Sequence, residues 1–472
     1  MAPVLACSGS RVRPEHRFRD IRCISARKRI LVLLTPSVFY HLRQACGWPH
    51  ERWSEPMKYT KLERNWVMYD VGNSALVLLN TSVVPIYFNA INTGADAATA
   101  VTAWANAQTI ASLVVALLMP ILGSLADYAG NKIKFFTGFF LTGVVLCLAQ
   151  AIPMPAMVFL TIYVLCTIGL NSSMTFYDAM LPDVTTDDRM DAVSSSGYAW
   201  GYIGSCVPFI LCIALIMGGP ALLGIDMLVA ARLSFIITGA WWVAFTIPLL
   251  RTYKQRFGKQ RDEAGVLANI ASTFRGLGTT CKSILHNKVL LVFMIAFFFY
   301  IDGVHTVISM ATTYGASLGI DSTQLVLALL VTQFVAFPSA IAYGSLARRC
   351  GTLRMIIVAV AAYVGIVLFA AFFLKSAAEF WMLAILVGLF QGGVQALSRS
   401  YFGRLIPKER ANEYYGFFDI FGRYASVMGT LLVSVVTSLT GNPSLGVLSI
   451  GILLVAGLVM LVKLSKMQAA AA

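Results

Sequence analysis

The chain has 472 residues, of which 58% are apolar and only 12% carry a charge. A soluble protein of this length needs far more polar surface, so a water-soluble helical domain is excluded. The formal net charge of +14 would suggest nucleic-acid binding in a soluble protein, but no arginine-rich patch with interleaved aromatic residues accompanies it. Basic residues also collect in the cytoplasmic loops of membrane proteins, so we expect a lipid bilayer rather than nucleic acid as the partner.

The first 56 residues differ from the rest of the chain. They are rich in arginine, contain Cys7, Cys23 and Cys46, and include no apolar run long enough to span a membrane. Residues 1–56 fit a disordered basic tail, an organellar transit peptide or a wrongly assigned start of translation. We prefer the third interpretation, because "MKYTKLERNW" from Met57 is a natural cytoplasmic lead-in to the first apolar segment.

Twelve apolar segments follow, each long enough to cross a bilayer as a helix. A spanning segment must satisfy its own backbone groups, which predicts an all-α integral membrane protein. The predicted spans are residues 66–91, 100–124, 134–152, 156–179, 194–217, 230–250, 289–314, 322–346, 353–374, 378–401, 413–439 and 444–464. They form an N-terminal six-helix bundle in residues 57–251 and a C-terminal six-helix bundle in residues 289–472, separated by a polar central loop at residues 252–288.

Basic residues lie almost entirely on one side of this arrangement, which we call the basic face. When the loops are assigned to alternate sides, the side opposite the N-terminus keeps little more than Arg232 and Lys375. This asymmetry predicts that both termini are cytoplasmic. We expect the plasma membrane, or a vacuolar or other organelle membrane in a eukaryote. The basic face holds Lys132, Lys134, Arg189, the basic residues of the central loop, Arg348, Arg349, Arg354, Arg399, Arg404, Lys408, Arg410, Lys463 and Lys466.

One short phrase occurs twice. "GSLADYAGNK" begins at Gly123 between spans two and three, and "GSLARRCGTL" begins at Gly344 between spans eight and nine. A second pair of phrases, "YDAMLP" from Tyr177 and "FGRLIP" from Phe402, ends spans four and ten. Matching phrases at matching places predict two homologous six-helix repeats, an arrangement in which transporters bind substrate near the membrane midplane between the halves.

The repeated phrase predicts a gate at the basic face. Glycine permits a tight turn and a close approach between helices. Asp127 is expected to face the N-terminal end of a neighbouring helix or an arginine, and Arg348 stands at its place in the second copy. Lys132 and Lys134 are expected to contact anionic lipid of the inner leaflet. The predicted gating glycines are Gly123, Gly130, Gly344 and Gly351.

These motifs resemble known families. "GSLADYAGNK" resembles the signature loop of the major facilitator superfamily, in which the Asp docks against the other half as a cytoplasmic gate latch. "NWVMYDVGNSA" from Asn65, "FYDAMLPDV" from Phe176, "YIDGVHTVISM" from Tyr300 and "GGVQALSRSYFGRLIP" from Gly392 resemble the vacuole-effluxer-like permeases. The resemblance covers residue 57 to the end of the chain. It implies the major facilitator fold and a secondary active transporter that moves a small polar solute, such as an amino acid, by alternating access.

Span seven carries Asp302 and His305, which are three residues apart and so share one helix face with Thr306, Ser309 and Thr313. Ionisable residues inside a span are candidates for function, and imidazole titrates near neutral pH. We hypothesise that this pair binds substrate and couples transport to protons. A structural hydrogen bond that lines a wet cavity is the alternative.

Span one has a similar polar stripe that starts at Asp70. The polar residues that follow Asp70 have the same sequence spacings as those that follow Asp302, through either repeat symmetry or chance. Asp70 is predicted to lie nearer the cytoplasm than Asp302, so we assign Asp70 to the gate. Amide and hydroxyl side chains can bind a zwitterionic or polyhydroxylated solute or, equally, join helices. Asp419 and Arg423, four residues apart, are expected to form a structural ion pair. The predicted substrate-binding residues are Asn73, Asn80, Asn171, Ser172, Asp302, His305, Gln391 and Gln395.

No motif indicates an enzyme. The nine cysteines include no C-x-x-C pair and no histidine cluster accompanies them, so we predict neither a metal site nor a cofactor. The zinc motif H-E-x-x-H and the phosphate-binding motif G-x-x-x-x-G-K-[ST] are absent, which argues against a metalloprotease and a nucleotide-driven pump. A drug or lipid exporter of the same fold is the alternative function, and a non-transporting receptor is a further one. We expect a monomer.

Overall fold

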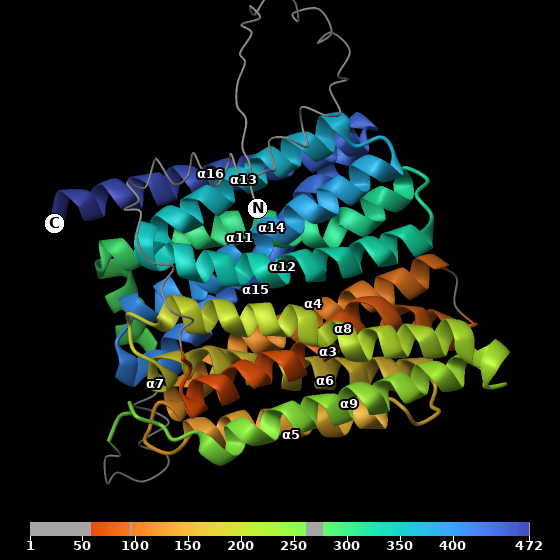
Figure 1. Cartoon of the computed structure of the whole chain (residues 1–472), viewed down its shortest axis with the longest axis horizontal. Helices are drawn as coiled ribbons and strands as arrows, with labels where there is room; N and C mark the ends of the chain where they lie inside the picture. The colour runs from red at the N-terminus through yellow and green to blue at the C-terminus, as the bar shows by residue number, and fades with distance from the viewer. Residues whose placement is uncertain (1–57, 95–96, 261–276, 472) are drawn as a thin grey trace, which may run out of the picture. The chain divides into compact units, whose positions relative to one another are not determined.

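Twelve long helices make up most of the residues that the computed structural model describes, which are 58–94, 97–260 and 277–471 (Figure 1). The side chains of residues 97, 98, 101, 317, 322, 423–427 and 471 are not described. The prediction for residues 1–56 lies outside the described residues. In the N-terminal half the helices are α3 (Lys61–Ile91), α4 (Ala97–Ala126), α5 (Lys132–Ala149), α6 (Ala156–Ala179), the short α7 (Leu181–Val184), α8 (Met190–Leu222) and α9 (Met227–Thr252).

The C-terminal half repeats this order of long helices. It contains α11 (Lys288–Ser317), α12 (Ser322–Cys350), α13 (Thr352–Phe373), α14 (Ala377–Leu405), the short η1 (Lys408–Arg410), α15 (Ala411–Thr440) and α16 (Pro443–Ala471). Eleven helices among the described residues are long and apolar enough to cross a membrane, and α15 contributes the apolar stretch Met428–Thr440. The predicted all-α fold is confirmed. The span at 156–179 has the predicted bounds, whereas α16 continues to Ala471 instead of ending at 464.

Local sequence fixes the ends of several helices. Thr60 begins α3 with a capping box: its hydroxyl accepts a hydrogen bond from the backbone N–H of Glu63 (3.2 Å), and the Glu63 carboxylate accepts one from the backbone N–H of Thr60 (2.7 Å). Gly351 ends α12 with a φ of 90°, a conformation that favours glycine. Between such ends, uninterrupted apolar sequence leaves the helix as the conformation that satisfies every backbone group inside a membrane.

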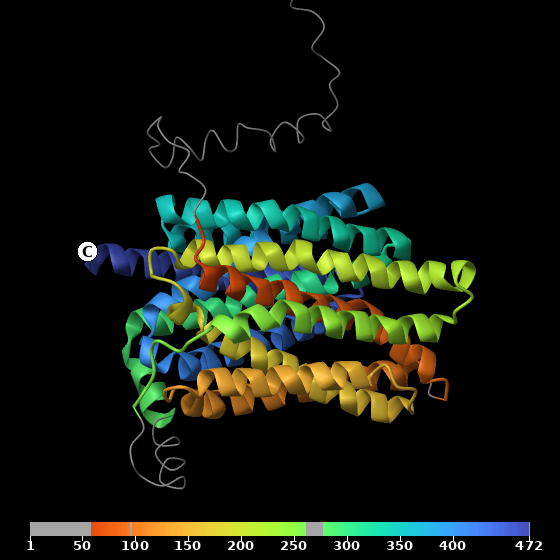
Figure 2. The same ribbon diagram turned by 60° about the horizontal axis from the view of Figure 1, so that its bottom comes forward.

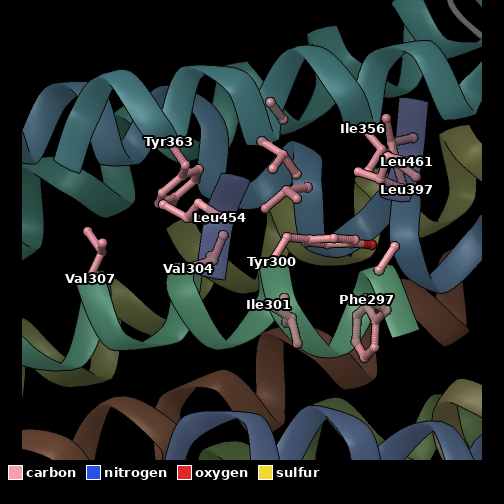
Figure 3. Close-up of a cluster of buried hydrophobic side chains, with 14 of the residues drawn as sticks. Phe297, Tyr300, Ile301, Val304, Val307, Ile356, Tyr363, Leu397, Leu454 and Leu461 are labelled. Carbon is pink, nitrogen blue, oxygen red and sulfur yellow. The ribbon is translucent and has the colours of Figure 1, made fainter. Parts of the chain in front are cut away.

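Each half has its own apolar core. In the N-terminal half, α3 packs on α8 and α9, and α5 packs on α6, around buried aromatic side chains such as Trp66, Tyr69 and Trp242. In the C-terminal half, α16 packs on α11 and α13. Figure 3 shows Val304 of α11 and Leu454 of α16 in this second core, with Tyr300 and Tyr363 nearby. Two separate cores allow the halves to move as units.

The two halves meet along four pairs of long helices, and α14 also contacts the short α7. The four pairs are α8 with α12, α4 with α15, α14 with α8, and α6 with α15 (Figures 1 and 2). Large apolar side chains elsewhere stay exposed, for example Leu117, Val145 and Ile452 at 60% or more. Such surfaces suit a lipid environment, where apolar side chains need no cover.

Candidate functional site

The first copy of the repeated phrase forms a joint between the halves. Asp127, directly after α4, is buried and accepts hydrogen bonds from the backbone N–H of Asn412 (2.9 Å), the Asn412 side-chain amide (2.8 Å) and the backbone N–H of Glu413 (3.2 Å). Those groups lie at the start of α15, where backbone N–H groups lack partners within the helix. The structure therefore has Asp127 at a helix N-terminus, as the sequence predicts.

Glycine makes this joint tight. A Cβ atom on Gly123 would lie 2.5 Å from the carbonyl oxygen of Asn412, so only glycine fits at this crossing of α4 and α15. Gly130 turns the chain with a φ of 77°. Burial raises the pKa of Asp127 to about 7, although Lys132, Lys259 and the Asn412 donors oppose that rise.

Lys132 corrects the sequence prediction. We expected it at the lipid surface, but it is buried, and its Nζ atom lies 2.6 Å from Asp183 Oδ2 and 3.0 Å from the carbonyl oxygen of Ala179. Lys134 is exposed, as expected. A long cationic side chain can thus turn inward when a buried carboxylate satisfies it. Asp183 also accepts from the Tyr253 hydroxyl (2.6 Å) and from the backbone N–H of Phe257 (2.9 Å).

The start of the central loop lies against the same turn. Gln255 Oε1 accepts from the backbone N–H groups of Gly130 (3.0 Å) and Lys132 (3.3 Å), and Lys259 exchanges two backbone hydrogen bonds with Asp127 and Ala129. The Lys259 ammonium group reaches Glu413 of α15 at 3.1 Å. We call residues 253–260 the strap, because this segment joins the first turn to the C-terminal half.

The second copy forms a matching joint with different side chains. A Cβ atom on Gly344 would lie 2.7 Å from the Cβ atom of Ser195, so α12 and α8 cross as closely as α4 and α15. Arg348 is exposed, unlike Asp127 at the matching place. The acid here is Asp191 of α8, which accepts from Thr352 (2.6 Å), Ser400 (2.5 Å) and Arg404 (2.8 Å).

A buried arginine joins the halves between these two turns. Arg399 of α14 donates to Asp178 of α6 (2.8 Å) and to the carbonyl oxygen of Ser194 on α8 (3.0 Å), and its Nη2 atom lies 3.4 Å from Asp70 of α3. Its side chain is 4% exposed. We assigned Arg399 to the basic loops, and that assignment is wrong. The predicted span 378–401 already contained it, so the signal was a charge inside a span.

Aromatic rings surround the same arginine. The Arg399 guanidinium carbon lies 4.7 Å from the ring centre of Trp66, 5.5 Å from that of Tyr177 and 4.5 Å from that of Tyr198. Ring faces attract a cation, and two carboxylates compensate its charge. Asp70 also accepts from the Tyr177 hydroxyl (2.7 Å). The gate role predicted for Asp70 stays a prediction, and its partners lie in both halves.

Asp302 of α11 is fully buried and bonds to α15. Its Oδ1 atom accepts from the backbone N–H of Gly429 (2.9 Å) and from the Thr306 hydroxyl (3.3 Å), whereas Oδ2 has no hydrogen-bond partner among the described residues. Gly429, which the sequence analysis missed, has no room for a Cβ atom because Thr306 and Asp302 press against it. His305 is half-buried one turn away. The carboxylate therefore keeps an acceptor available inside the protein.

A hydrogen bond that occurs in both halves indicates which residues of α3 and α11 correspond to each other. Tyr69 bonds to Ser173 (2.7 Å), and Tyr300 makes the same bond to Ser398 (2.6 Å). If Tyr69 matches Tyr300, Asp302 matches residue 71, one position after Asp70, and this register favours chance over repeat symmetry for the equal polar offsets.

The remaining predicted residues are spread over four helices. Asn73 is buried and donates to Asp70 (3.3 Å), and Asn80 Oδ1 and Ser172 Oγ are buried without hydrogen-bond partners among the described residues. Asp419 accepts from the Thr175 hydroxyl of the other half. The side chain of Arg423 lies outside the described residues, so its ion pair with Asp419 stays a prediction. Gln391 is buried, and Asn171 and Gln395 are half-buried.

No group of three or more His, Cys, Asp or Glu residues suited to a metal ion occurs in the described ranges.

Two six-helix halves, joined at one end of their spans by repeated turns, define a transporter of the major facilitator type. The chain belongs to the family described as vacuole effluxer Atg22 like, which matches residues 104–471. The protein is thus a multi-pass integral membrane transporter and not an enzyme.

Relatives in bacteria and fungi support this assignment. The chain is 43% identical over 411 residues to the uncharacterized MFS-type transporter YxiO of Bacillus subtilis, and the alignment covers 86% of this chain and 95% of that protein. It is 26% identical over 272 residues to autophagy-related protein 22-2 of Aspergillus clavatus, covering 53% of this chain and 44% of that protein.

Solved structures show the same fold at low sequence identity. The proton:xylose symporter XylE aligns with a TM-score of 0.67 at 12% identity, covering 85% of this chain and 95% of that one. A bacterial homologue of the iron transporter ferroportin aligns with a TM-score of 0.63 at 14% identity, covering 86% and 98%.

Proposed function

We propose that the protein is a secondary active transporter that moves a small polar solute, such as an amino acid, by alternating access. The observation that carries this proposal is the buried Asp302 carboxylate, which has an oxygen without a partner among the described residues and bonds to α15, the helix of the same half that contacts α4 and α6 of the N-terminal half. A buried polar atom without a partner costs free energy, so it is retained where a ligand or a proton can bind.

The polar stripes support a crevice that opens away from the basic face. Along α11, Asp302 and Thr306 are buried, whereas Ser309 and Thr313, farther from the basic face, are exposed. Among the polar-stripe residues of α3, Asp70, Asn73 and Asn80 are buried and Thr81 is exposed. The bonds of Asp127, Asp191 and Arg399 between the halves lie toward the other, basic end. Two helix bundles that are joined at the basic end and carry polar side chains toward the other end fit one state of an alternating-access cycle.

Proton coupling through Asp302 and His305 is the finer part of the proposal. A carboxylate held by a backbone N–H and a hydroxyl can take up a proton at its second oxygen, and a neighbouring imidazole can exchange one near neutral pH. The family description supports export of a solute from a compartment, and the amino-acid class rests on the resemblance noted in the sequence and on the amide and carboxylate groups of the predicted lining.

Transport in proteoliposomes tests the proposal. A thermal-shift screen against metabolites selects the solute, and counterflow of labelled against unlabelled solute then distinguishes a carrier from a channel or receptor. We expect Asp302→Asn and His305→Ala to abolish uptake driven by a pH gradient, with Thr313→Val as the matched polar control on the same helix. Counterflow that continues in these variants would limit the pair to proton coupling, and counterflow that is also lost would show that the pair binds the solute. Gradient-driven uptake at the wild-type rate in both variants would disprove the coupling role.

A further inference from the structure

A basic pocket lies at the second copy of the repeated phrase. It has a volume of about 510 Å³ and is formed where the α12–α13 turn meets the ends of α14 and α16. Arg349, Arg354 and Arg404 line it, together with Thr352 and Gln468. Arg349 and Arg354 are exposed, and Arg354 makes no hydrogen bond or ion pair with another described residue. Three guanidinium groups around one pocket, of which Arg404 also pairs with Asp191 (2.8 Å), are suited to a phosphate group, which they can bind through charge-assisted hydrogen bonds.

The first repeat shows what occupies the matching position there. The backbone N–H groups of Gly130 and Lys132, at the start of α5, both bond to the side-chain oxygen Gln255 Oε1 of the strap. At the start of α13, the matching Gly351 has no side-chain cap, and no atom lies within 4 Å of the place where its Cβ atom would be. In one repeat the chain thus supplies an oxygen acceptor, and in the other the same place opens into the arginine-lined pocket.

The pocket continues a lipid-facing surface. Ile452, Val455, Val459 and Val462 are exposed by 38% or more and follow one face of α16 at spacings of three and four residues. The next positions on that face are Ser465 and Ala469, which line the pocket. An acyl chain on this stripe would therefore lead directly to the three arginines.

We propose that this pocket binds the phosphate group of an anionic phospholipid from the leaflet at the basic face. Basic pockets between membrane helices bind anionic headgroups because the guanidinium groups meet the phosphate at the depth of the headgroup layer. The site does not depend on the transported solute, so it can be tested without a transport assay.

Lipid binding to the purified full-length protein, measured by native mass spectrometry, tests the site. The probes are phosphatidylglycerol, phosphatidylcholine with the same acyl chains, and glycerol 3-phosphate. The double variant Arg349→Gln/Arg354→Gln removes two pocket charges. The matched control Arg251→Gln/Lys288→Gln removes two exposed charges of the basic face away from the pocket. Unchanged circular dichroism and elution volume show that both variants are folded.

We expect phosphatidylglycerol affinity to fall roughly thirtyfold in the pocket variant and to change by less than about threefold in the control. Phosphatidylcholine and glycerol 3-phosphate should bind wild type weakly. Equal losses in the two double variants, or no loss in the pocket variant, would overturn the site. Glycerol 3-phosphate binding as tightly as phosphatidylglycerol would overturn the lipid assignment in favour of a soluble phosphate.

Discussion

The turn between α4 and α5 and the turn between α12 and α13 share a backbone but differ in their side-chain partners. Both turn at a glycine with positive φ, Gly130 at 77° and Gly351 at 90°. Both follow a helix whose glycine, Gly123 or Gly344, meets the opposite half in close contact. At the fifth position of the phrase, however, Asp127 is buried and Arg348 is exposed.

Each joint therefore contains a carboxylate, but its source differs. The turn itself supplies the carboxylate in the first joint, and the helix packed against the turn supplies it in the second. In the first joint the turn supplies Asp127 and α15 supplies backbone donors. In the second joint α8 supplies Asp191, and Thr352 of the turn supplies a hydroxyl donor. Since Asp191 already supplies the acid, residue 348 is released to the surface, where an arginine suits the basic face.

The largest effect is expected at Arg399, the buried cation of the C-terminal half that pairs with two acids of the N-terminal half. Arg399→Gln leaves Asp70 and Asp178 without their cation in a buried site, a change that costs roughly 3–5 kcal/mol of stability. The melting temperature of the purified protein should therefore fall strongly, whereas Arg348→Gln, which removes an exposed arginine, should leave it unchanged. Equal melting of the two variants would show that Arg399 does not compensate the two acids.

Replacing the fifth residue of each repeated phrase by alanine should have different effects in the two turns. Asp127→Ala takes the acceptor from two backbone N–H groups at the start of α15, and loss of a hydrogen bond to a charged group costs roughly 1.5–3 kcal/mol. Arg348→Ala should change stability by less than about 0.5 kcal/mol. Spin-label distances between the basic ends of α4 and α15 should report an open population in the first variant only. An open population of equal size in both would contradict the asymmetry.

The glycine contacts should behave alike in the two joints. Gly123→Ala and Gly344→Ala force a Cβ atom into the opposite half, and overpacking of this kind costs roughly 1–3 kcal/mol. Gly138→Ala on α5 is the control, because no atom lies within 4 Å of its Cβ position. The same spin-label distances measure the result. A closed state unaffected by either joint variant would show that the halves are not in close contact there.

The smallest predicted effect is a pH dependence confined to the first joint. Burial in the docked state raises the pKa of Asp127 to about 7. When the turn docks on α15, the carboxylate therefore takes up a proton at pH values between the ordinary pKa of an aspartate and 7. The docked state is thus favoured at acidic pH and loses that advantage as pH rises through 7, by about tenfold between pH 6 and pH 8. Asp127→Asn should flatten this dependence, and a slope that persists in the variant would assign it to another group.

Sequence reasoning succeeded where one residue type has one plausible environment. Long apolar runs gave the spans, the repeated phrase gave the matching turns, and Asp127 meets a helix N-terminus as expected. It failed for Lys132 and Arg399, because a basic residue near a span end can face lipid headgroups or turn inward to an acid. It also missed Asp178, Asp191 and Gly429, whose roles depend on partners far away in sequence.

The amino-acid sequence alone determined the membrane class, the helix count, the duplication and the basic face, since hydropathy and local repeats do not depend on contacts between distant residues. Only the tertiary structure decided which charges are buried together. The ion pairs of Arg399 and Lys132 form because helices distant in sequence bring the acids within bonding distance, and burial then requires each charge to have a partner.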